Sequence, residues 1–205
     1  MTESSTSRFS SYRQFDDAKI HCRECHVGHV YDHVVCSDGC FGRPRVVVCG
    51  EAPGADEVVE GRPFVGAAGK VLRPVMNEFG FRKSNATITN VIPCRPERNQ
   101  FPDDDDLVRR CMAMWLCEEL RILDPDLLLV LGATPLKFLL MASGITAIRG
   151  RWCRLPNWHR EVWAMPTYHP AFVLRKSKMQ GGDEILAQFR SDIKAVAVRA
   201  GFVAG

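Results

Sequence analysis

Four residues that could take part in binding or chemistry each stand at the end of a short apolar segment that is typical of a β-strand. They are Glu51 after 45–50, Asn90 near the end of 86–91, Gly132 at the end of 126–132, and His169 near the end of 161–170. A carboxylate can orient water, an amide can read a hydrogen-bonding edge, and an imidazole can stabilise a developing negative charge. Each residue alone is better explained as a polar loop position. The four together favour a site.

The segment after the first of these strands, 49–70, reads CGEAPGADEVVEGRPFVGAAGK. It places a carboxylate before a Pro-Gly turn, then adds a second acidic cluster and a Gly/Ala-rich helix start. Small residues let the backbone approach a ligand closely. The segment therefore indicates a loop built around a small planar ligand.

Nine cysteines form the second group with chemical potential. An odd number without an export signal argues against a disulfide framework. Four thiolates suit zinc or a 4Fe–4S cluster, and one such set joins a Cys-x2-Cys pair to two later cysteines: Cys22, Cys25, Cys94 and Cys111.

The cysteine pattern leaves alternatives open. Cys22 and Cys25 with His29 and His33 could form a local zinc site, although the gap between Cys25 and His29 is short for a Cys2His2 finger. Cys36 and Cys40 offer a further pair. Cys94 and Cys111 could instead be ordinary buried thiols, which are common for this residue. Spacing alone does not choose between iron–sulfur and zinc.

The elements that must position these residues alternate between strand and helix. Helices are expected at 67–80, 103–123, 134–143 (with Thr134 as its cap) and 183–200, with a short one opening the segment 11–33. This order predicts an α/β fold of three layers, α/β/α, around a central four-stranded parallel sheet. In such folds ligands bind at the carboxyl ends of the strands. Residues 1–10 are Ser/Thr-rich and expected to be disordered, and 11–205 form a single domain.

The bulk properties set limits on the class of protein. The net charge of +3 permits a polyanionic partner without requiring one. The first residues, MTESSTSRFSS, contain no apolar run of a signal peptide, and the longest apolar run is too short to span a bilayer. We expect a soluble, intracellular (cytoplasmic) monomer with no membrane partner.

Four motifs, in this order, closely resemble the family 4 uracil-DNA glycosylases: GEAPGADEVVEGRPFVGAAGK, TNVIPCRP, RG at 149–150, and TYHPAFVLR. The resemblance runs from Cys22 to about Arg175. It implies a uracil-DNA glycosylase fold and an enzyme of base-excision repair that flips uracil out of DNA and hydrolyses its N-glycosidic bond. It also implies a 4Fe–4S cluster on Cys22, Cys25, Cys94 and Cys111, with a cluster-binding segment at about 20–42.

The resemblance implies a role for three polar residues. Glu51 would orient and activate water and favour the cationic sugar, whose charge is like that in other glycoside hydrolyses. His169 would donate to uracil O2 as negative charge develops there. Asn90 would read the base edge, its amide donating to O4 and accepting from N3–H. Each has a plainer interpretation, as a turn or strand-end residue.

The same resemblance assigns the walls of the pocket. Phe64 would stack on the base, although phenylalanine is more often a core residue. Glu57 would line the side of C5 and order the loop, which disfavours a 5-methyl group. Gly50 and Ala52 would let the backbone approach closely.

The DNA contacts are less specific. Arg175, Lys176 and Lys178 follow the His-Pro turn, and Arg149 and Arg151 flank Gly150. Such cations could hold phosphates, which fix register without reading sequence. A solvated basic face explains them about equally well.

Two features depart from the family pattern. A related branch that bonds covalently to DNA carries a basic insertion ending in His before the fourth cysteine, and this chain has none, so we expect no covalent capture. Ala171 stands where the family usually has Ser, so the resemblance does not extend to the phosphate contact of that residue, whereas the chemistry is unaffected.

Two other functions compete with uracil excision. One is a glycosylase of the same fold that acts on another modified pyrimidine, for example in phage defence. The other is a zinc-stapled module that binds DNA or a nucleotide without catalysis.

Overall fold

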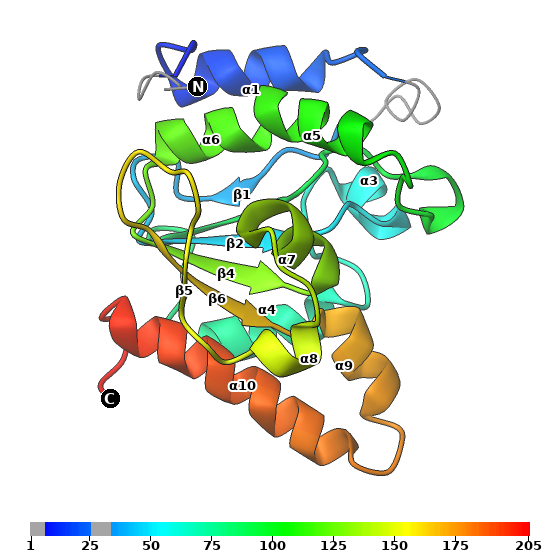
Figure 1. Cartoon of the computed structure of the whole chain (residues 1–205), viewed down its shortest axis with the longest axis vertical. Coiled ribbons are helices and arrows are strands. Elements are labelled where there is room, and N and C mark those ends of the chain that lie inside the picture. Colours follow the sequence, from blue (N-terminus) through cyan, green and yellow to red (C-terminus); the bar gives the residue numbers. More distant parts are fainter. Residues whose placement is uncertain (1–6, 26–33) are drawn as a thin grey trace.

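The computed structural model describes residues 7–25 and 34–205, which fold around a single mixed sheet (Figure 1). Its strand order is β1-β3-β2-β4-β6-β5. The four inner strands pair in parallel: β2 (Val46–Gly50), β3 (Ala86–Asn90), β4 (Leu127–Leu131) and β6 (Trp163–Thr167). They confirm the predicted four-stranded parallel core. Two-residue strands add antiparallel edges, β1 (Asp38–Gly39) on β3 and β5 (Cys153–Arg154) on β6.

The inner strands form because their side chains are buried on both faces of the sheet. β2 is VVVCG and β4 is LLLVL, and every residue of both is buried. Continuous apolar runs of this kind are typical of parallel strands covered by helices on both sides. The pairing register sets Gly50 beside Asn90 and Leu131 beside Thr167. The carboxyl ends of the four strands therefore meet at one edge of the sheet.

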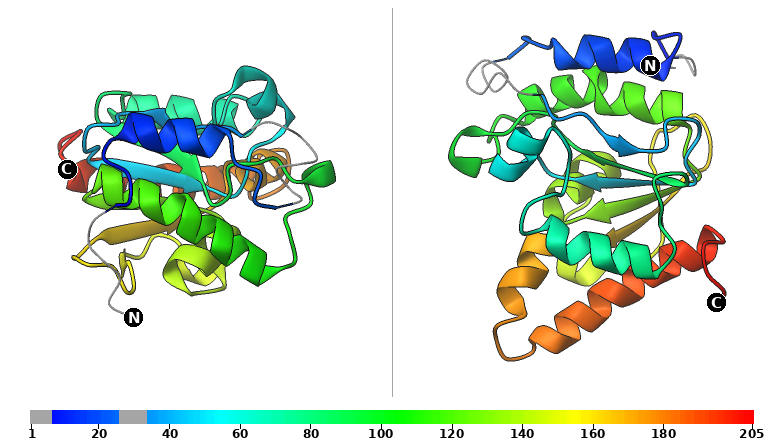
Figure 2. Two further views of the ribbon diagram at one scale, coloured as in Figure 1. Left: turned by 90° about the horizontal axis from the view of Figure 1, so that it is seen from above. Right: turned by 180° about the vertical axis from the view of Figure 1, so that it is seen from behind.

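Helices cover both faces, which completes the predicted three layers (Figures 1 and 2). On one face, α4 (Gly69–Glu78) and α10 (Gly182–Arg199) enclose a core with Val46, Val48 and Leu129, and α9 (Pro170–Lys176) joins it through Val173. On the other face, the core around Val47 and Leu128 is closed by α5 (Asp105–Met114), α6 (Leu116–Leu123) and α7 (Ala133–Leu140), and the short α8 (Ile145–Ile148) packs beside it.

The N-terminal helix α1 (Tyr12–Ile20) lies against α6 (Figure 1). Lys19, 2% exposed, pairs with Glu119, which is fully buried, at 3.3 Å. Tyr12 and Thr89 donate to the same carboxylate at 2.5 and 2.9 Å. Burial alone would raise the pKa of Glu119, but the Lys19 charge and the hydroxyl donors hold it below its usual value. A satisfied buried network therefore fixes α1 to the rest of the domain.

The end of the expected disordered tail also contacts this helix pair. The hydroxyl of Ser7 and the backbone N–H of Arg8 donate to Glu118 at 2.8 and 3.1 Å. Residues 1–6 lie outside the described residues.

Two helix predictions need correction. The segment 103–123 is not one helix but two, α5 and α6, because Trp115 leaves the helical conformation at φ −120° and ψ −63°. Thr134 does not cap α7; the cap position is Gly132, and the hydroxyl of Thr134 points elsewhere. Helix α3 (Ala55–Glu60) and the single-turn helix η1 (Glu97–Asn99) were not predicted.

Within the part of the chain that the structure describes, no helix is both long and apolar enough to cross a membrane.

Candidate active site

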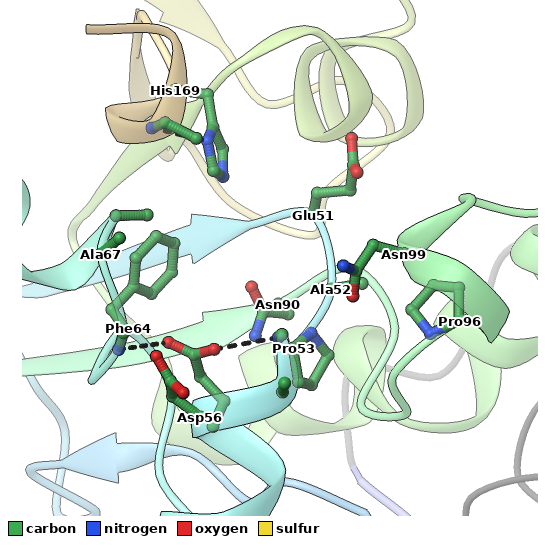
Figure 3. A pocket seen from close by; sticks show the side chains of 16 residues that line it. Glu51, Ala52, Pro53, Asp56, Phe64, Ala67, Asn90, Pro96, Asn99 and His169 are labelled. Atoms are coloured by element: carbon green, nitrogen blue, oxygen red, sulfur yellow. Dashed lines mark hydrogen bonds between the residues drawn. The ribbon is translucent and has the colours of Figure 1, made fainter. Parts of the chain in front are cut away.

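A cavity of about 320 Å³ opens at the carboxyl ends of the parallel strands (Figure 3). Its walls include four residues singled out from the sequence: Glu51, Phe64, Asn90 and His169. They come from the loop after β2, the end of β3 and the turn after β6. The structure thus brings together in one cavity residues that are up to 118 positions apart, as the strand order predicts.

Glu51 is held at both its backbone and its side chain. Its carbonyl accepts from the N–H of Ile92 at 3.2 Å, which continues the pairing of β2 with β3. Its Oε2 accepts a short hydrogen bond from the hydroxyl of Thr134 on α7. Thr134 was missed in the sequence because its hydroxyl was assigned to the helix cap.

Asn90 is the last residue of β3 and is 7% exposed. Its Oδ1 is buried, and no described residue donates a hydrogen bond to it. A buried amide oxygen without a partner is costly unless a ligand supplies a donor. Gly50 lies directly opposite, and a Cβ there would come within 2.5 Å of both Asn90 Oδ1 and Phe64 Cζ. Glycine at position 50 therefore leaves room for both side chains.

His169 is the N-cap of α9, and its Nδ1 accepts from the backbone N–H of Ala171 at 3.2 Å. A nitrogen that accepts cannot carry the proton, so the neutral ring bears its hydrogen on Nε2. Burial, and then the positive charge of Arg175, lower the pKa of His169 to about 4. The ring is therefore a neutral hydrogen-bond donor at physiological pH.

Phe64 forms a wall of the cavity beside His169, with ring centroids 6.0 Å apart and a 5% exposed side chain. Its backbone has φ +54°, a left-handed conformation that costs energy for a bulky residue. Arg73 of α4 holds this conformation by donating to the carbonyls of Pro63 and Phe64 at 2.7 and 2.8 Å. Asp38 accepts from the same guanidinium at 2.9 Å. Nothing local in the sequence marks Arg73 for this role.

Glu57 acts on the loop rather than through a free carboxylate. Its Oε1 accepts from the backbone N–H groups of Val65 and Gly66 at 2.9 and 2.8 Å, and its Oε2 from that of Gly54 at 3.0 Å. These bonds tie together the two ends of the segment from Gly54 to Gly66, both of which line the cavity. Glu57 thus orders the loop, as expected, and both of its carboxylate oxygens accept hydrogen bonds from backbone N–H groups.

The cavity also contains residues that the sequence did not suggest. Asn99 and Pro96 lie across from Phe64 (Figure 3), on the loop that follows Cys94. Asn99 is left-handed, at φ +57°, and its Oδ1 accepts from Arg95 at 2.9 Å. Ala52, predicted for close approach, lines the cavity too.

The four cysteines of the predicted set lie near one another. Cys22 and Cys25 pack against the small apolar cluster that Cys94 forms with Val34 and Leu107. Burial, and then the neighbouring Cys22 and Cys25, raise the pKa of Cys94 to about 12, and burial with the other three thiols raises that of Cys111. All four are free thiols. The indole N–H of Trp115 donates to Cys22 Sγ at 3.3 Å.

No three His, Cys, Asp or Glu side chains among residues 7–25 and 34–205 lie close enough together to ligate one metal ion. The alternative zinc site used His29 and His33, which lie outside the described residues. Cys36 also packs near this group, and burial raises the pKa of its thiol to about 12, although the charge of Lys19 opposes the rise. Cys40 donates to the Gly42 carbonyl at 3.6 Å.

The basic residues divide into two groups. The guanidinium of Arg149 forms an ion pair with the buried Asp192, which also accepts from Thr167 at 2.7 Å. That side chain is therefore engaged within the fold. Among the other candidates, Arg151, Arg175 and Lys178 are exposed, and Lys176 lies over the ring of Phe172 at 5.9 Å.

Comparisons with known proteins place the chain in a family. The family model described as the uracil DNA glycosylase superfamily matches residues 36–194. The type-4 uracil-DNA glycosylase of Sulfurisphaera tokodaii is 30% identical over 194 residues, covering 92% of this chain and 86% of the relative. That of Archaeoglobus fulgidus is 31% identical, covering 85% and 86%, and that of Pyrobaculum aerophilum 38% identical, covering 66% and 71%. The chain belongs to the uracil DNA glycosylase superfamily, because the family model and these relatives match it along most of its length.

Proposed function

We propose that this protein is a uracil-DNA glycosylase, which binds a uracil flipped out of DNA and hydrolyses its N-glycosidic bond to leave an abasic site. The observation that carries the proposal is the convergence of Glu51, Asn90 and His169 in one cavity beside an aromatic wall. Relatives that align along most of the chain are named as type-4 uracil-DNA glycosylases. A base can reach such a cavity only when it has left the stack.

Asn90 and Phe64 would recognise the base. Uracil offers a donor at N3 and an acceptor at O4, and the side-chain amide of Asn90 can accept from the first and donate to the second. Its Oδ1 is buried without a partner among the described residues, so N3–H would satisfy it. Cytosine reverses both groups and would leave them unpaired. The ring of Phe64 would stack on the base.

His169 and Glu51 would carry the chemistry. When the bond between C1′ of the sugar and N1 of uracil breaks, the electron pair leaves with the base and negative charge gathers on O2. The Nε2–H of neutral His169 would donate to O2 and stabilise that charge. Glu51 would favour the cationic sugar and take a proton from the water whose oxygen bonds to C1′.

Cys22, Cys25, Cys94 and Cys111 would hold a 4Fe–4S cluster, which supplies a covalent staple between the N-terminal segment and the rest of the domain. The donor set fits: four free thiols from three parts of the chain lie together, and Trp115 gives Cys22 the N–H···S contact that tunes thiolate ligands. Each of the four cysteines would supply one thiolate to the cluster as a whole, rather than all four to a single shared ion. This is compatible with the lack of a single-ion site in the described residues.

The DNA partner would be held through its phosphates. Arg175 and Lys176 lie on α9, directly after His169, and Lys178 follows that helix. Cations in this position would bind the DNA phosphates next to a flipped nucleotide. Such contacts fix the position of the protein along the DNA without reading its sequence.

The test is single-turnover excision on oligonucleotides that each carry one uracil, one thymine or one other modified pyrimidine, scored as abasic sites. Wild type should release uracil far faster than the other bases. Replacing His169 by Ala should slow uracil release about 100- to 1000-fold, the usual effect of losing one such donor. His159→Ala, outside the cavity, is the matched control and should leave the rate unchanged. Equal rates for His169→Ala and wild type would show that this cavity is not the active site. Faster release of another pyrimidine would show that uracil is not the preferred substrate.

A further inference from the structure

The turn between β4 and α7 contacts both residues assigned to the chemistry. Gly132 has φ +95°, and its N–H donates to the carbonyl of Thr167 at 2.9 Å, which ties the turn to the end of β6. A Cβ at Gly132 would lie 2.9 Å from Cβ of His169. Two residues later, the hydroxyl of Thr134 donates to Oε2 of Glu51. One short segment thus sets the position of His169 on one side and of Glu51 on the other.

The hydroxyl of Thr134 completes the fixation of Glu51. The backbone of Glu51 is already held by Ile92 at 3.2 Å, and Thr134 holds one of its two carboxylate oxygens. The side chain is therefore restrained at both ends, and Oε1 remains as the oxygen that can face a water. A carboxylate that must meet a water in one direction gains from such a restraint, because misplacement by about 1 Å can cost 100-fold in rate.

A purely structural explanation of Thr134 is weaker. The N-cap of α7 is Gly132, so the helix does not depend on the hydroxyl of Thr134 as its cap. The side chain is only half-buried, whereas the apolar packing of this helix comes from Leu136, Leu139 and Leu140.

We propose that Thr134 is a positioning residue for the glycosylase reaction: its hydroxyl orients Glu51 so that Oε1 faces the attacking water. The inference rests on the proposed function, because it assigns to Glu51 the handling of that water. It adds a residue from α7 to a site otherwise built from the ends of β2, β3 and β6.

The experiment compares Thr134→Val, which keeps the shape but loses the hydroxyl, with Thr134→Ser, which keeps the hydroxyl. Single-turnover uracil release should fall about tenfold or more in Thr134→Val, because hydrogen bonds to charged groups are among the stronger ones. Thr134→Ser should stay within about threefold of wild type. Thr146→Val, an exposed threonine on α8, is the matched control and should be unchanged.

A double-mutant cycle separates positioning from general damage. In a Glu51→Ala background, adding Thr134→Val should change the rate less than about twofold, because the hydroxyl no longer has a carboxylate to orient. Thermal unfolding midpoints of all variants are measured alongside. Equal losses in both backgrounds, or a Thr134→Val rate within about threefold of wild type, would overturn the inference alone. A wild type that releases no base would overturn the proposed function together with the inference.

Discussion

Replacing Glu57 by Gln is the most direct test of how the base-binding loop is held. The carboxylate of Glu57 accepts three backbone hydrogen bonds, two at Oε1 and one at Oε2. Glutamine has the same shape, and its carbonyl oxygen can keep the pair from Val65 and Gly66. Its NH2 group then faces the N–H of Gly54, and because both groups are donors, this hydrogen bond is lost. The negative charge of the side chain is lost as well.

The cost follows from these contacts. A hydrogen bond to a charged acceptor contributes about 1.5–3 kcal/mol, and an unsatisfied buried N–H costs about 1–3 kcal/mol. Because the remaining two bonds also lose their charge, we expect a loss of about 2–4 kcal/mol in the local stability of the loop. Each 1.4 kcal/mol corresponds to a factor of ten, so the loop amides should exchange roughly 30- to 1000-fold faster with solvent.

Amide hydrogen exchange of Val65 and Gly66, measured residue by residue, is the assay. Glu60→Gln is the matched control: the residue lies on the same helix, α3, and its carboxylate is exposed beside Arg62 at 3.6 Å. The control should exchange like wild type. If Val65 and Gly66 exchange in Glu57→Gln no faster than in wild type, the three bonds do not hold the loop, and the reasoning fails.

Four further predictions concern the choice of base, the effects of acid on catalysis and on stability through His169, and the cluster. Asn90→Asp should lose most uracil release and gain some cytosine release that grows at lower pH, since a protonated carboxyl can donate to cytosine N3; full uracil activity in an excision assay would show that Asn90 does not read the base. Because the pKa of His169 is lowered from 6.5 to about 4, the neutral ring persists in mild acid, and single-turnover rates should show no loss from this group between about pH 8 and 5. The same shift means that the stability contributed by the neutral ring is present above pH 6.5 and is lost as the pH falls toward 4, so acid unfolding of wild type should be steeper in that window than that of His169→Gln. Cys94→Ser should abolish the brown colour and the roughly four irons per chain that a 4Fe–4S cluster requires, whereas Cys36→Ser should retain both by iron analysis.

The sheet could be predicted because its signal is local. Each inner strand is a short, continuous apolar run, and burial on both faces makes that run necessary. The edge strands, of two residues each, leave no such pattern. The break at Trp115 was also missed, because it contains neither glycine nor proline and the apolar spacing continues through it.

The candidate site could be predicted in part for a different reason. Glu51, Asn90 and His169 stand at strand ends, and parallel strands bring their carboxyl ends to one edge. Thr134 and Arg73 lie on helices, and their hydrogen bonds depend on how those helices pack against the rest of the domain. The residues next to them in the sequence give no sign of these contacts. Residues of this kind become visible only when the tertiary structure gives them a partner.

The buried pair of Lys19 and Glu119 also sets an order of events during synthesis. One hundred residues separate the two side chains, and at about 5–20 residues per second the second emerges roughly 5–20 s after the first. Until Glu119 has been synthesised, Lys19 on α1 lacks its buried carboxylate partner, and the segment with Cys22 and Cys25 lacks this anchor to the rest of the domain. Helix α1 is therefore synthesised before the helix that it contacts, and its buried ion pair can form only after α6 has been made.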